Sequence, residues 1–302
     1  MPVRFCPSPG SYAVIRMDPV AMVEHLHDPV ALSAAEAVEV KSYLVYIDRD
    51  LSLPFPGKPW YSFSISLLAT TLRKSDEERG TTPEMCLPIA PNERHPLGRE
   101  PLRTDPPFPF PSCYHWVSVN ADVRVRARHE GFNTNDAVRL PPEERVRMRS
   151  YWNMDIADCE DARRDRQLAL FAYTRPGAGD STAEASATAD AHEQRKEDSE
   201  CADTEQVPDH ASAGSDSSSV RSSLSADTVD GIIGLGGVFG APSHNPELLP
   251  LVDLWLDLSG RITAEAIPDP MDFYKECYEV SKIIHGARAR DPTLPHLDLS
   301  DV

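Results

Sequence analysis

The residue types that could do chemistry begin with Cys113 and His115, which lie two positions apart. That spacing puts both side chains on one face of a strand, where they could supply two metal ligands or the nucleophile and base of an enzyme. His25, His27 and Asp28 crowd two imidazoles and a carboxylate near a helix end. A zinc site needs three or four closely spaced ligands, and neither group has further ligands nearby. We expect no metal and no cofactor, and an enzyme with a pocket near Cys113 and His115 stays an alternative.

A row of arginines, Arg124, Arg126 and Arg128, occupies every second position of a predicted strand. Their side chains should lie on one face, about 7 Å apart. Guanidinium groups bind phosphates and carboxylates through paired hydrogen bonds, so the row is a candidate site for an anion or an acidic peptide. Nucleic acid is a less favoured ligand because no aromatic residues alternate with the arginines. The competing interpretation is a solvated face or ion pairs with a neighbouring strand.

Five serines close to acidic or basic residues are candidate phosphorylation sites: Ser217, Ser218, Ser219, Ser222 and Ser223. They lie in residues 176–228, which contain no aromatic residue and show no hydrophobic periodicity. Such a segment cannot bury enough apolar surface to offset its ordering entropy, so it is predicted to be disordered. Kinases could reach these serines there. The alternative is a plain flexible linker.

The sequence GIIGLGGVFGAP, residues 231–242, resembles a phosphate-binding loop at first sight. A dinucleotide fingerprint needs G-x-G-x-x-G after a strand. Gly234 and Gly236 fit, but the third position is Phe239, and no strand is predicted before it. We expect an apolar segment packed on the core where the chain returns to the fold. Docking of a partner, or insertion into a membrane, is the alternative if Ile232, Ile233 and Phe239 are exposed.

The elements that position these residues follow from hydrophobic periodicity. Residues 117–128 alternate strictly between apolar and polar side chains, as in a half-buried strand of an antiparallel sheet. Asp followed by Pro predicts a helix start, because Asp caps free N–H groups and Pro lacks one. Residues 73–112 carry nine prolines and predict a long irregular loop. Strands are expected near residues 11–17, 43–48, 60–68 and 113–128, and helices after Asp18, Asp28 (to about Val40), Pro141 (to about Tyr173), Asn245 (to Leu258) and Asp269 (to about Gly286).

The net charge of −18 disfavours general binding to nucleic acids or anionic membranes. Residues 176–230 hold 13 acidic and 3 basic residues, a net charge of −10, so more than half of the excess lies there. The six cysteines are far apart, which is typical of reduced thiols rather than a disulfide framework. No signal peptide or membrane-spanning run is evident. These features predict a cytoplasmic or nuclear protein that does not enter a membrane.

Together the patterns predict an α+β fold, in which helices cover an antiparallel sheet. Residues 1–175 form the core domain, residues 176–228 a disordered acidic insertion, and residues 229–302 a segment whose two helices pack back on the same core. The function expected is a non-catalytic interaction or regulatory protein with another protein as its partner. The alternatives are an enzyme of unfamiliar type near Cys113 and His115, and an anion or nucleic-acid binder that uses the arginine row.

Overall fold

The structure, a computed structural model, describes residues 3–135, 137–174 and 246–297, with the backbone alone for residues 171–174. Contacts divide the chain into two units, Met1–Leu168 with Ser225–Val302, and Ala169–Leu224. Of the second unit only the end of one helix, residues 169–174, is described.

Three of the sequence predictions fall outside the described residues. They are the disorder of residues 176–228, the packing of residues 231–242 against the core, and the five candidate phosphorylation serines. They stay predictions.

Six strands form a mostly antiparallel sheet in the order β4-β3-β2-β8-β6-β5, and only the β6–β8 pair is parallel. β4 also pairs with β6, so the strands β4, β3, β2, β8 and β6 close into a ring. A closed ring leaves few unpaired strand edges. The strands are β2 (Tyr12–Met17), β3 (Ser42–Asp50), β4 (Trp60–Ala69), β5 (Cys86–Pro88), β6 (Tyr114–Arg126) and β8 (Leu251–Trp255).

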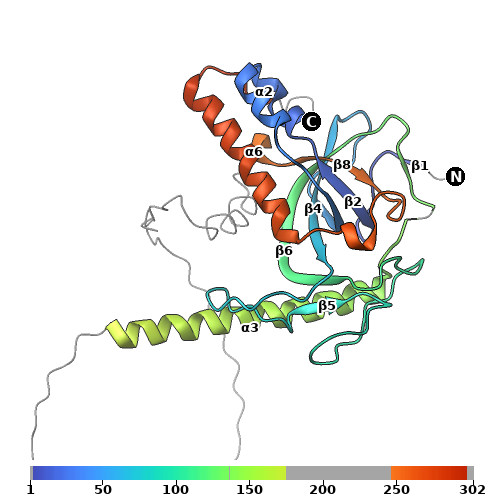
Figure 1. The fold of residues 1–302 in the computed structure, drawn as a ribbon. Coiled ribbons are helices and arrows are strands. Elements are labelled where there is room, and N and C mark those ends of the chain that lie inside the picture. The colour runs from blue at the N-terminus through green and yellow to red at the C-terminus, as the bar shows by residue number, and fades with distance from the viewer. Residues whose placement is uncertain (1–2, 136, 175–245, 298–302) are drawn as a thin grey trace, which may run out of the picture. The chain divides into compact units, whose positions relative to one another are not determined.

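The long strand β6 bends strongly, as Figure 1 shows. Ser118 has a φ of 58°. The register with β4 shifts at the same place, because Ser66 faces Asn120 whereas Leu68 faces His115. The extra residues of β6 form a bulge, and bulges increase local bending and twist. The bend lets one strand pair with β5 at its start and with β8 near its end.

Two apolar cores lie on the two faces of this curved sheet. Alternate residues of β2 separate between them: Ile15 belongs to the first core, and Tyr12 and Val14 to the second. Both faces are therefore buried, which explains why β2 and β3 are almost continuously apolar. The half-exposed pattern predicted for β6 is confirmed at Ser118 and Asn120, which are exposed between buried neighbours.

Three helices cover the first core: α1 (Pro19–Val23), α2 (Pro29–Glu36) and α6 (Pro270–Arg290). Each begins at a predicted Asp-Pro pair, and the Asp side chain accepts a hydrogen bond from a backbone N–H of the first turn. α2 and α6 lie side by side in Figure 1. Helix α2 ends four residues earlier than predicted, and α6 continues past Gly286 to Arg290.

The second core is covered by α3 (Pro142–Thr174) and by the proline-rich loop around β5. Helical spacing predicts one apolar face that carries Met148, Trp152, Ile156 and Cys159. Met148, Trp152 and Cys159 are buried in the second core, whereas Ile156 is 38 % exposed. Helix α3 is therefore amphipathic over only part of its length.

The helix predicted over residues 246–258 is wrong. This segment forms a single 3₁₀ turn, η2 (Pro246–Leu248), followed by strand β8. Val252 and Leu254 face the first core, while the intervening Asp253 and the following Trp255 are half-buried. The leucines fit a helix or a strand, and pairing with β2 and β6 decides for the strand. The C-terminal segment thus contributes one strand and one α-helix to the core.

Candidate functional site

Cys113 and His115 are both fully buried in the second core. His115 Nε2 lies 2.9 Å from the Tyr12 hydroxyl, and the imidazole contacts the rings of Tyr46 and Trp152. Burial raises the pKa of the Cys113 thiol to about 12 and lowers the pKa of His115 to about 3. At neutral pH the thiol is therefore protonated and the imidazole uncharged. A nucleophilic cysteine needs the opposite environment, one that lowers the thiol pKa.

The candidate cluster of His25, His27 and Asp28 does not form one site, because His25 and Asp28 contact different partners. Asp28 caps α2 by accepting a hydrogen bond from Val30 N, and it also pairs with Arg290 of α6. His25, in the 3₁₀ turn η1 (Glu24–Leu26), lies 3.3 Å from the carboxylate of Glu247. The two groups thus serve different contacts within the fold. Among the described residues, no group of three or more His, Cys, Asp or Glu side chains is placed to hold a metal ion.

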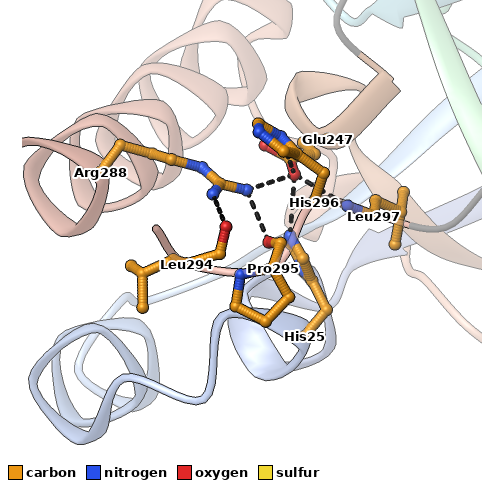
Figure 2. Close-up of polar contacts among 7 residues, drawn as sticks. All are labelled: His25, Glu247, Arg288, Leu294, Pro295, His296 and Leu297. Carbon is orange, nitrogen blue, oxygen red and sulfur yellow. Dashed lines mark hydrogen bonds and ion pairs between the residues drawn. The ribbon is translucent and has the colours of Figure 1, made fainter. Parts of the chain in front are cut away.

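Glu247 is the centre of a polar cluster, shown in Figure 2. Its Oε1 accepts hydrogen bonds from Arg288 Nη2 at 2.5 Å and from Leu297 N at 2.8 Å. The same oxygen lies 3.3 Å from His296 Nδ1, as it does from His25 Nε2. Arg288 also donates to the backbone oxygens of residues 294 and 295. One carboxylate therefore connects η1, η2, α6 and the C-terminal residues 294–297.

Burial acts to raise the pKa of Glu247, but the Leu297 N–H and the Arg288 guanidinium together outweigh it, and the pKa is lowered. Burial is also the largest influence on His25 and lowers the pKa of that imidazole, against the pull of Glu247. Glu247 is thus a carboxylate anion that forms an ion pair with the guanidinium of Arg288. This arrangement holds segments together, whereas a general acid at neutral pH would need a raised carboxyl pKa.

Two arginines of the predicted row are held within the fold. Arg124 is 2 % exposed, and its Nε donates to the backbone oxygen of Leu249 at 3.0 Å. Burial lowers the pKa of Arg124 to about 10, against the opposing charge of Glu247. Arg126 pairs with Asp18 at 2.5 Å and with Asp253 at 3.7 Å. Both guanidinium groups therefore have partners within the chain already.

The third arginine of the row, Arg128, lies in a different environment. Its guanidinium carbon is 5.2 Å from the ring centroid of Trp255, and that of Arg261 is 4.9 Å from the same ring. Neither arginine has a carboxylate oxygen within 4.0 Å among the described residues. Burial lowers the pKa of Arg128; the charges of Asp253 and Glu130 oppose this, and the charge of Arg261, the smallest of the four influences, lowers the pKa as well. Two cations thus meet at one indole ring.

These three side chains line a hollow of about 220 Å³, which we call the arginine pocket. Phe132 and Asn133 line it too, where strand β7 (Phe132–Asn133) pairs with β1 (Val3–Arg4). Asp257 is the one acidic residue among its described lining residues. The Oδ1 of Asp257 accepts a hydrogen bond from Gly260 N in the turn that follows β8. The pocket thus presents, beside an aromatic surface, two guanidinium groups that form no ion pair with the part of the chain that the structure describes.

Only Arg128 of this pocket was identified from the sequence. Trp255 was missed because a helix was predicted over residues 246–258. Arg261 follows the end of that predicted helix and belongs to no pattern that would indicate a site. A strand interpretation of that segment would have placed Trp255 on one face with Asp253 and Asp257, but it would not have shown which strand lies alongside. The pairing of β8 with β6 brings the two parts together across more than 120 residues of chain.

Comparisons with known proteins add no assignment: no protein-family model, no curated protein and no solved structure matches this chain. Across residues 3–135, 137–174 and 246–297, no helix is long and apolar enough to cross a membrane.

Proposed function

We propose that this chain is a non-catalytic interaction protein, and that its arginine pocket holds an anionic group of a binding partner. The observation that carries the proposal is that Arg128 and Arg261 both lie at the ring of Trp255 and that neither has a carboxylate partner among the described residues. Guanidinium groups form paired, charge-assisted hydrogen bonds with carboxylates and phosphates. A bound anion would also relieve the repulsion between the two cations.

The ring of Trp255 favours this arrangement in the free protein. An arginine near an indole gains about 0.5–1 kcal/mol at an exposed site, which partly offsets the repulsion between like charges. The aromatic surface also restricts where each guanidinium can lie, so less side-chain freedom is lost when an anion binds. The pocket is thereby prepared for its ligand before binding.

The surroundings of Cys113 and His115 favour a non-catalytic function over the enzyme alternative. Both groups are fully buried, and burial moves the pKa of each away from the charged form that a nucleophile and base would use. The net charge of −18 further favours a short-range, local contact with an anion over general attraction of polyanions.

Binding of a fluorescein-labelled hexaglutamate peptide to the full chain, followed by fluorescence anisotropy, tests the proposal. We expect weak, salt-sensitive binding that falls at least about threefold in an Arg261→Gln variant, since loss of even an ordinary hydrogen bond costs about 0.5–1.5 kcal/mol. Arg103→Gln is the matched control, because Arg103 is 75 % exposed and lines neither this pocket nor the neighbouring hollow. Equal binding by wild type and Arg261→Gln, or an equal loss in Arg103→Gln, would overturn the proposal.

A further inference from the structure

A second hollow, of about 430 Å³, shares Arg128 with the arginine pocket. The rings of Phe5 and Tyr61, whose centroids are 6.0 Å apart, line it together with Lys58 and His129. No acidic residue occurs among its described lining residues. Arg128 thus lines both the arginine pocket and the second hollow, whose other lining side chains are mainly aromatic and basic.

The loop between β3 and β4, residues 51–59, lines the second hollow with its last three residues and carries two exposed apolar side chains just before them. Leu53 is 67 % exposed and Phe55 is 57 % exposed. The loop is held in place, since the Tyr61 hydroxyl donates to Phe55 O at 3.2 Å and Lys58 Nζ lies 5.6 Å from the Phe55 ring centroid. Exposed apolar side chains at a fixed position beside a hollow are typical of a contact surface.

The chemistry of this surface selects a protein segment as its occupant. An apolar side chain of the partner that covers Leu53 and Phe55 would remove apolar surface from water and so stabilise the complex. A nucleic acid would present mainly phosphates and bases to this surface. Lys58 and Arg128 are cationic groups on a strongly acidic chain, so they complement a short acidic segment locally. A long polyphosphate backbone would extend past these two groups and meet repulsion from the acidic remainder of the chain.

We infer that the second hollow and the 51–59 loop bind a linear segment of another protein that carries a large apolar residue next to acidic residues. The inference rests on the proposed function, because the acidic residues occupy the arginine pocket. The apolar residue contacts Phe5 and Phe55, which are 43 % and 57 % exposed. Since one arginine borders both hollows, the two kinds of residue must lie within a few positions of each other in the partner.

Three fluorescein-labelled peptides test this inference on the full chain by fluorescence anisotropy. The first is Gly-Glu-Glu-Gly-Phe-Leu-Gly, the second replaces Phe-Leu by Ser-Ser, and the third replaces Glu-Glu by Gln-Gln. We expect the first peptide to bind about tenfold more tightly than the second, a difference that burial of one large apolar side chain can supply. The third should bind more weakly than the first because it lacks the anions.

Two variants show which residues cause the tighter binding of the first peptide. A Leu53→Ser/Phe55→Ser variant should lose the difference between the first two peptides while it binds the second as the wild type does. Leu97→Ser is the matched control, because Leu97 is 69 % exposed and lines neither hollow, and it should keep the full difference. Arg261→Gln should weaken both acidic peptides.

The outcomes separate this inference from the proposed function. Equal binding of the first two peptides, with a loss in Arg261→Gln, would overturn the inference and leave the anion pocket standing. Absence of binding by either acidic peptide would overturn both. Tighter binding of a labelled oligothymidine than of the first peptide would assign the surface to nucleic acid and overturn the inference. If light scattering shows that the wild type dimerises and that the Leu53→Ser/Phe55→Ser variant does not, the surface binds a second copy of the chain, and the inference is also overturned.

Discussion

Replacement of Glu247 by Gln should destabilise the protein through the cluster in Figure 2. The Glu247 side chain is 2 % exposed and that of its partner Arg288 is 17 % exposed. Gln keeps the size of the side chain and an oxygen that can accept from Leu297 N. It removes the negative charge, so Arg288 is left nearly buried without an anion.

The size of the loss in the free energy of unfolding depends on how many hydrogen-bond partners Arg288 keeps after the substitution. Loss of one partner from a fully buried ion pair costs about 3–5 kcal/mol. Arg288 also donates to two backbone oxygens, at residues 294 and 295, and it is not fully buried. The loss should therefore be smaller, about 2 kcal/mol in the free energy of unfolding, within the range of one charge-assisted hydrogen bond.

The assay is urea unfolding followed by tryptophan fluorescence at pH 7. Glu265→Gln is the matched control, because Glu265 is exposed in the turn η3 (Ala264–Ala266), away from the cluster, and it should change stability by less than about 0.5 kcal/mol. Folding lowers the pKa of Glu247, so its contribution is complete above the ordinary carboxyl pKa of about 4.3. The gap between wild type and Glu247→Gln should close as the pH falls through the lower pKa of the folded state.

A double-mutant cycle with Arg288→Gln gives the refutation. If the two side chains form the pair described, Glu247→Gln should cost less in the Arg288→Gln background than in wild type. An equal cost in both backgrounds would show that the loss does not come from this pair. A Glu247→Gln variant as stable as wild type would refute the structural interpretation of the cluster as a whole.

Three further predictions concern other groups. Burial raises the pKa of Glu276 to about 6, although the Tyr43 hydroxyl donates to it, so the ionised form costs stability. Relative to wild type, Glu276→Gln should gain about 1–2 kcal/mol between pH 4.5 and pH 7, measured by urea unfolding, and a constant difference would contradict this. Cys113 should stay unmodified by iodoacetamide under conditions that label the half-buried Cys6, as read by mass spectrometry of the native protein; early labelling of Cys113 would revive the enzyme alternative. Arg124→Gln should lower the thermal midpoint by several degrees, because a buried hydrogen bond is lost, and an unchanged midpoint would show that this contact contributes nothing.

Much of the fold could be predicted from local patterns. The alternation in residues 117–126 predicted strand β6, and the Asp-Pro pairs at residues 18, 28 and 269 predicted three helix starts, because a period and a cap are properties of neighbouring residues. Strand β8 was missed for a related reason. Its leucines suit a helix equally well, and the sheet partners that decide the matter are far away in the sequence.

The candidate sites could not be predicted to the same extent. Arg124 fits an exposed row by its spacing, yet β8 and the residues before it cover this part of β6 and bury it. Arg128 and Arg261 meet at Trp255 only because β8 lies alongside β6. His25 and Glu247 are 222 positions apart. Contacts of this kind depend on the closed order of the strands, which the one-dimensional pattern does not contain.

The most direct test of the anion pocket is the indole N–H signal of Trp255 in a nitrogen-15 NMR spectrum of the full chain. The chain has four tryptophans, and a Trp255→Phe variant assigns the signal by its loss. On addition of hexaglutamate at constant ionic strength, the Trp255 signal should move and saturate in wild type, and it should stay in place in Arg261→Gln. A signal that does not move in wild type, or that moves equally in both proteins, would contradict the assignment of this pocket to an anionic partner.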